Sequence, residues 1–121
     1  MLKENHIAAA GSIAAAVARA RALHPALPLI VEVESLAELE QALAAGCERI
    51  LLDDFDEAML REAVRRAAGR IPLEVSGSVS LERLPAIAAT GVDYVSVGAL
   101  TKHVRAIDLS LRLSAAAADR R

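Results

Sequence analysis

The sequence predicts an α/β fold in which parallel strands are connected by helices. Short stretches rich in valine, isoleucine and leucine alternate with longer stretches of helical periodicity, which is typical of parallel strands with helical crossovers. The strands also end at nearly equal intervals, at Glu32, Asp53, Ser76 and Gly98. A length of 121 residues, 55% of them hydrophobic, fits one domain. A parallel sheet must be covered on both faces, so a layer this small is also compatible with being part of a larger unit.

Capping and terminating residues mark the helices. Ser12 and Ser35 are suitable N-caps, and Ser35 begins a capping-box pattern. Pro25, Gly46 and Gly69 follow the expected helix ends. Each strand is a short run of apolar, mostly β-branched residues. The expected elements are a helix over 12–24, a strand over 28–34, a helix over 35–46, a strand over 49–53, a helix over 56–68, a strand over 71–77, a helix over 81–89, a strand over 93–98 and a last helix over 107–113.

The two ends of the chain are interpreted separately. The polar residues 3–6, KENH, lie before any expected helix, and the simplest interpretation is a polar terminus. Alternatively, Met1 and Leu2 are the stub of a strand, which places Lys3 at its carboxyl end beside the other polar strand ends. At the other end, the alanine-rich residues 114–121 are expected to form a disordered tail outside the fold of residues 1–113.

Composition excludes several classes of protein. The net charge of −2 gives no reason to expect nucleic acid or an acidic membrane as partner, and only 2% of residues are aromatic, so base-stacking surfaces are scarce. The apolar runs are short and interrupted by charge, so no membrane span is expected. The single cysteine, Cys47, cannot form an internal disulfide, and no secretory leader is recognised, so a cytoplasmic location is expected.

The strand ends combine glycines with charged groups. The stretch VSVGALTKH, residues 95–103, ends an apolar strand at glycine and alanine and then places Lys102 and His103 close behind. Glycine lets the backbone approach a ligand, so amides near Gly77 and Gly98 can face a phosphate. The functional residues expected at this rim are Ser76, Gly77, Ser78, Gly98, Lys102 and His103 for phosphate.

The two acidic strand ends suit a different part of the same ligand. Glu32 and Asp53 would repel a phosphate placed on them, but they suit a magnesium ion, ribose hydroxyls or a developing cationic centre. A sugar phosphate therefore satisfies both halves of the site. Plainer interpretations remain: Gly98 as an ordinary turn, Asp54 as a solvated loop residue, and Glu74, which shares a strand face with Ser76, as either site-facing or structural.

An ordered set of motifs resembles a known family. The stretches LKENHIAAAGSI, VEVESLAEL, ILLDDF, LEVSGSVSL and TGVDYVSVGALTKHVRAIDLSL resemble the carboxyl-terminal part of nicotinate-nucleotide pyrophosphorylase (carboxylating), or quinolinate phosphoribosyltransferase. The resemblance implies part of a TIM-like, open α/β barrel. It implies formation of nicotinate mononucleotide, pyrophosphate and CO₂ from quinolinate and phosphoribosyl pyrophosphate with Mg²⁺, an NAD biosynthesis step, in a homodimer or higher oligomer.

The resemblance also implies roles for individual residues. Lys3 corresponds to a substrate-binding lysine, and Glu32 and Asp53 correspond to the carboxylates near the ribose and the metal. Residues 76–78 and the turn Val97, Gly98 and Ala99 correspond to the phosphate-binding turns.

The chain matches the family pattern at some places and departs from it at others. The family often has asparagine at the position of Asp54 and glycine at that of Ser78, and Lys102-His103 resembles one of two variants at that place. The family's amino-terminal domain and early barrel strands are not in this sequence, which suggests a fragment or a truncated product. Two alternatives stay open: a non-catalytic half-barrel that binds phosphate or oligomerises, and a related pyrophosphorylase with another acceptor.

Overall fold

The computed structural model describes residues 1–114 and contains a four-stranded parallel sheet in the order β1-β2-β3-β4. The parallel α/β fold predicted from the alternation is therefore confirmed. Each strand pairs with the next one along the chain, as expected when every connection is a helical crossover. The strands are β1 (Ile30–Val33), β2 (Arg49–Asp53), β3 (Leu73–Ser76) and β4 (Tyr94–Val95).

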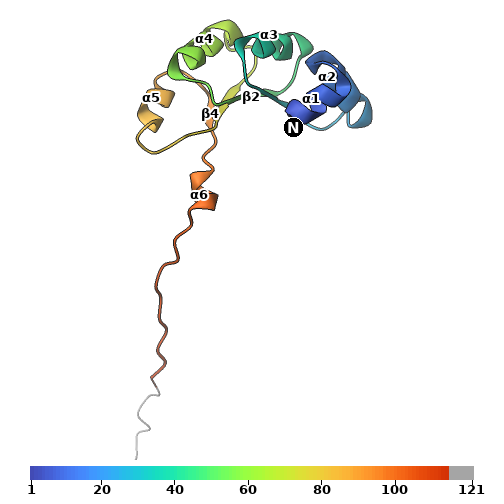
Figure 1. Ribbon diagram of the computed structural model, residues 1–121. Coiled ribbons are helices and arrows are strands. Elements are labelled where there is room, and N and C mark those ends of the chain that lie inside the picture. The colour runs from blue at the N-terminus through green and yellow to red at the C-terminus, as the bar shows by residue number, and fades with distance from the viewer. Residues whose placement is uncertain (115–121) are drawn as a thin grey trace, which may run out of the picture.

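The larger helices form an arc along one side of the sheet (Figure 1). Side chains at their first turns explain where three of them begin: the oxygens of Ser12, Ser35 and Asp56 each accept a hydrogen bond from a backbone amide three residues ahead. None of the helices in residues 1–114 is long and apolar enough to cross a membrane. The helices are α1 (Glu4–Ala10), α2 (Ile13–Leu23), α3 (Leu36–Ala45), α4 (Glu57–Ala67), α5 (Leu84–Ala88) and α6 (Ala99–Lys102).

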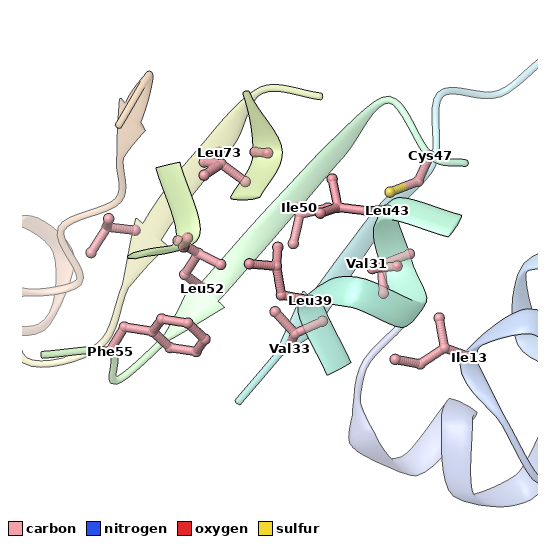
Figure 2. Packing of buried hydrophobic residues seen from close by; sticks show 14 of the residues in the cluster. Ile13, Val31, Val33, Leu39, Leu43, Cys47, Ile50, Leu52, Phe55 and Leu73 are labelled. Atoms are coloured by element: carbon pink, nitrogen blue, oxygen red, sulfur yellow. The ribbon is translucent and has the colours of Figure 1, made fainter. Parts of the chain in front are cut away.

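The core lies between the sheet and this arc of helices (Figure 2). Alternate strand residues point toward the helices, because successive side chains of a strand face opposite sides. On β2 these are Ile50 and Leu52, which are fully buried against Leu39 of α3 and Leu60 of α4, among others. The strand residues on this side are Val31, Val33, Ile50, Leu52, Leu73 and Val75.

The opposite face of the sheet, called the inner face here, is largely polar. The register aligns Glu32 with Leu51, Leu51 with Glu74, and Glu74 with Tyr94, so these residues form one row on that face. One pleat further on, Asp53 aligns with Ser76. The fold thus places apolar residues under the helices and charged residues on the inner face near the carboxyl ends of the strands.

The amino terminus confirms one expectation and corrects another. Leu2 forms a parallel bridge with Val31, through hydrogen bonds of 2.8 and 2.9 Å, so the strand stub exists and Lys3 lies at its carboxyl end. The expectation that residues 3–6 precede any helix is wrong, because α1 begins at Glu4. The imidazole Nδ1 of His6 accepts a hydrogen bond from the Lys3 amide at 3.2 Å, which helps this short helix begin.

The carboxyl-terminal part differs most from prediction. The last helix expected over 107–113 is wrong: residues 104–114 have no regular secondary structure. From Ile107 to Leu113 the apolar side chains recur at every second position, a spacing that does not form one helical face, and they are exposed. A short helix, α6, occurs instead over 99–102, and the strand expected over 93–98 is limited to β4. Most of the predicted alanine-rich tail, residues 115–121, lies outside the described residues.

Replacing Ile50 with valine tests the core. The Ile50 side chain is fully buried, so Ile50→Val should lower the free energy of unfolding by about 0.5–1.5 kcal/mol. Ile107→Val makes the same chemical change at an exposed position and should change it by less than about 0.5 kcal/mol. Urea denaturation followed by circular dichroism measures both values, and equal effects of the two variants would contradict the described core.

Candidate functional site

A buried carboxylate and a lysine form an ion pair at the carboxyl edge of β1. The Nζ of Lys3 donates a hydrogen bond of 2.7 Å to Oε2 of Glu32, and the side chains are 50% and 8% exposed, respectively. This hydrogen bond is the main reason why the pKa of Lys3 is raised above its ordinary value. A buried carboxylate needs a partner, so Lys3 stabilises the charge of Glu32 while its own amine remains accessible.

Asp53 lies at the same edge, at the end of β2. It shares the inner face with Glu32, and its negative charge also contributes to the raised pKa of Lys3. In the described part of the chain, its carboxylate accepts no side-chain hydrogen bond and forms no ion pair. The edge therefore combines one neutralised and one accessible carboxylate.

The two glycine turns predicted to bind phosphate line one cavity of about 600 Å³. The cavity thus brings together residues from the ends of β3 and β4, as the regular spacing of the strand ends predicts. Lys102 and His103 of the α6 region line the same cavity, so positive charge is available beside the turns. The lining residues are Ser76, Gly77, Ser78, Val79, Ser96, Val97, Gly98, Ala99, Lys102 and His103.

The carboxylates and the turns share an edge but not a cavity. Glu32 lines a separate cavity of about 250 Å³, together with Glu34 and Glu38 among others, and Asp53 lines neither. A further cavity, about 630 Å³, lies mainly between α1, α2 and the loop before β1. Within residues 1–114 the structure thus forms the two halves of the predicted site as neighbouring surfaces rather than one enclosed pocket.

The two glycines occupy different backbone conformations. Gly77 has a φ of +81°, and a Cβ there would clash with the Asp54 carboxylate and lie 2.9 Å from the Asp54 backbone nitrogen, so the fold itself requires glycine. Gly98 has a φ of −66°, and a Cβ there would approach only the Lys102 side chain, at 3.9 Å. No contact within the described structure requires glycine at position 98, whereas a ligand close to the backbone would.

Two non-glycine residues next to the site have left-handed backbone conformations. Asp54 has a φ of 53° and Ser78 a φ of 47°. Glycine and asparagine tolerate this region better than most residues. The family that the sequence motifs resemble often has asparagine at the position of Asp54 and glycine at that of Ser78. Both residues suit a left-handed backbone better than the ones present here.

A polar network on the inner face was not predicted. Glu74 accepts hydrogen bonds from Arg49 on one carboxylate oxygen, at 2.9 Å, and from the Ser96 hydroxyl on the other. The guanidinium of Arg49 also lies 4.0 Å from the centre of the Tyr94 ring. Burial acts to raise the pKa of Glu74, but the bonds from Ser96 and Arg49 outweigh it, and the pKa is lowered. The sequence contains one clue to this network: Arg49, Leu51 and Asp53 are two residues apart in one strand, so their side chains lie on the same face of the sheet.

Comparison with known proteins decides the family. Residues 1–112 match the family described as quinolinate phosphoribosyl transferase, C-terminal domain. The chain belongs to this family. The match covers the described strands, both glycine turns and the three charged residues of the edge.

Relatives and solved structures agree with this assignment. The chain is 47% identical over 116 residues to nicotinate-nucleotide pyrophosphorylase [carboxylating] of Mycobacterium leprae, and 41% identical over 120 residues to that of Rattus norvegicus. These alignments cover 93% and 95% of this chain but 41% and 40% of the relatives. The structure of the nicotinate-nucleotide pyrophosphorylase from Francisella tularensis has a TM-score of 0.85 at 50% identity, covering 90% of this chain and 39% of that one. The chain thus spans about 40% of the length of its relatives.

Alanine at the two glycines should separate folding from binding. Gly77→Ala introduces a clash and a strained φ, so we expect it to lower the free energy of unfolding by roughly 1–3 kcal/mol. Gly98→Ala should leave that energy unchanged or slightly raise it, because the backbone is helical there, yet it should weaken binding of inorganic phosphate. Thermal unfolding and phosphate titration followed by NMR give the two readouts. Unchanged phosphate binding in Gly98→Ala would contradict a backbone contact at this turn.

Glycine at position 78 should relieve strain. Because Ser78 is left-handed, Ser78→Gly should raise the free energy of unfolding by up to about 1 kcal/mol. Ser110→Gly is the control, since Ser110 is exposed and its φ is not positive, so added chain entropy alone should leave stability equal or lower. Chemical denaturation compares the two, and a stabilising Ser110→Gly would show that strain at position 78 is not the cause.

Proposed function

We propose that this chain provides the ribose- and phosphate-binding part of an enzyme that converts quinolinate and phosphoribosyl pyrophosphate to nicotinate mononucleotide, pyrophosphate and CO₂ in NAD biosynthesis. The observation that supports this most strongly is the edge itself. The Lys3–Glu32 pair and Asp53 lie at the same end of the sheet as two glycine turns around one cavity. Family membership makes this reaction the favoured one among those that handle sugar phosphates.

In the proposed complex, the turns hold the phosphate of the substrate. Amides around Gly77 and Gly98 donate to phosphate oxygens, with the hydroxyls of Ser76 and Ser78 beside them. Lys102 and His103 line the cavity and offset the negative charge. Residues on two neighbouring strands therefore position one end of the sugar, and the other end lies toward the carboxylates.

The carboxylates act on the ribose. As the bond to the pyrophosphate leaving group breaks, positive charge develops on the anomeric carbon, and fixed negative groups nearby stabilise it. Asp53 is available for this role, and Glu32 contributes while Lys3 keeps its buried charge paired. The half-exposed amine of Lys3 also suits a carboxylate of quinolinate.

We propose Mg²⁺ as the cofactor. The described residues contain no group of three or more metal-ligating side chains, and Lys3 already pairs with one oxygen of Glu32. Two acidic side chains nevertheless fit Mg²⁺, which is usually held by one or two carboxylates together with substrate phosphates. Glu32 and Asp53 are the residues that would hold it. When bound, the ion neutralises charge on the pyrophosphate.

The remaining parts of the site are proposed to come from outside these residues. The chain spans about 40% of its relatives, so the groups that hold quinolinate together with Lys3 are proposed to belong to the other portion and to a homodimeric or larger assembly. A cytoplasmic setting is proposed because the single cysteine, Cys47, is buried and forms no disulfide in the described chain. Free thiols are typical of reducing compartments.

A second candidate function is phosphate binding without catalysis. It is favoured by the cavity between the turns, because residues of this chain alone line it. A different acceptor substrate has less support, since the relatives compared above are named as nicotinate-nucleotide pyrophosphorylases. Measuring catalysis separates the two functions.

A chimera provides this measurement. This chain replaces the matching portion of the Mycobacterium leprae relative, which is 47% identical, and nicotinate mononucleotide formation is assayed. Asp53→Ala in the chimera should reduce turnover by about 10²–10³-fold, the typical loss when a preorganised charge is removed. Asp108→Ala, an identical change at an exposed position, should leave turnover unchanged.

The controls decide between outcomes. A well-folded chimera that forms no product, while the unmodified relative does, would contradict the catalytic proposal and favour simple phosphate binding. Near-normal turnover in Asp53→Ala would contradict only the proposed role of Asp53 and would leave the catalytic proposal standing.

A further inference from the structure

The Glu74 carboxylate joins three strands on the inner face. Its two oxygens accept hydrogen bonds from Arg49 at the start of β2 and from Ser96 directly after β4. Glu74 itself lies in the middle of β3 and is largely buried, with 8% of its surface exposed. Every charged group of this network therefore has a partner, as burial requires.

The strand at one end of this network is the weakest part of the sheet. Strand β4 contains only Tyr94 and Val95. It is attached to β3 by the hydrogen bond from the Asp93 amide to the Leu73 carbonyl, at 3.0 Å, and by that from the Ser96 amide to the Val75 carbonyl, at 2.8 Å. Asp93 also accepts a hydrogen bond from the Leu73 amide through its side chain. So short a ladder leaves the chain after Ser96 dependent on side-chain contacts.

The segment that follows is the proposed phosphate turn. Val97, Gly98 and Ala99 come directly after Ser96 and face residues 76–78 across the cavity. No backbone pairing to β3 continues beyond Ser96 in the described residues. The two hydrogen bonds of Ser96, from its amide to Val75 and from its hydroxyl to Glu74, are therefore the last attachments to β3 before the turn. Glu74 does not line the cavity, so it can act on a ligand there only through Ser96.

We propose that Glu74 is a positioning residue, which holds the Val97–Ala99 turn in register with residues 76–78 through Ser96. Arg49 supports it by satisfying the second carboxylate oxygen and by packing on the Tyr94 ring of the same short strand. This inference rests on the proposed function only in that the turn binds phosphate. The Glu74–Arg49 ion pair, which does not line the cavity, is thereby given a role in the geometry of the phosphate site.

The test uses the 121-residue chain and inorganic phosphate. Two variants weaken the bond from opposite sides: Ser96→Ala removes the hydroxyl donor, and Glu74→Gln replaces the charged acceptor with a neutral amide oxygen. NMR shifts of the Gly77 and Gly98 amides give the dissociation constant for phosphate, and hydrogen exchange at the amide of position 96 reports the β3–β4 pairing without ligand. Ser35→Ala is the matched control, because it removes a helix cap far from the cavity.

A positioning role predicts the same result in both variants. Phosphate binding should weaken by about 10-fold, as for loss of one charge-assisted hydrogen bond, and exchange at position 96 should accelerate in the ligand-free chain. The double variant should bind phosphate no more weakly than Ser96→Ala, because without the hydroxyl the acceptor at position 74 has nothing to position. Ser96→Thr keeps the hydroxyl and should restore binding, whereas Ser35→Ala should leave the dissociation constant unchanged.

Other outcomes overturn the proposal in distinguishable ways. If only Ser96→Ala weakens binding and exchange at position 96 is unchanged, Ser96 is a direct phosphate contact and Glu74 has no positioning role. If Glu74→Gln does not fold, the exchange measurement in Ser96→Ala decides alone. If the unaltered chain shows no shift of the Gly77 and Gly98 amides with phosphate, the phosphate site fails and this inference fails with it.

Discussion

The neutralisation of charge on the inner face of the sheet is the constraint on which the site depends. The helices cover one face, and the register places acidic residues on the other, so each buried carboxylate must find a cation nearby. Glu32 pairs with Lys3, and Glu74 pairs with Arg49. Asp53, one pleat closer to the edge, is only partly buried and needs no such partner. The depth of a residue along its strand therefore determines whether its charge must be paired within the fold.

The backbone at the edge follows a similar division. Gly77 is required by the fold because its φ is positive and Asp54 fills the space where a side chain would lie. Gly98 has no such reason within residues 1–114, and its backbone faces the open cavity. A glycine that the fold does not need is better explained by what approaches it. The same sequence pattern, a glycine after a strand, thus has two physical causes in neighbouring repeats.

Much of this arrangement was predictable from sequence, because strand and helix periodicities and the caps at Ser12 and Ser35 are local properties. Their repetition placed Glu32, Asp53 and the glycine turns at one edge, as observed. The network around Glu74 was not predictable, because it depends on the register between three strands rather than on any one of them. The last helix failed for a different reason: in residues 107–113 leucine and isoleucine suggested a helix, but their two-residue spacing gives no helical face.

The two halves of the edge differ in how firmly their charges are held. The acidic half is fixed by strands and by the Lys3–Glu32 bond, so its field is set before any ligand arrives. The basic half consists of exposed Lys102 and His103 at the end of a four-residue helix, with no ion pair in the described chain. A preorganised acidic half suits a charge that develops briefly on a sugar carbon. Adaptable cations suit a phosphate group, whose charge is permanent and whose binding can itself order the side chains around it.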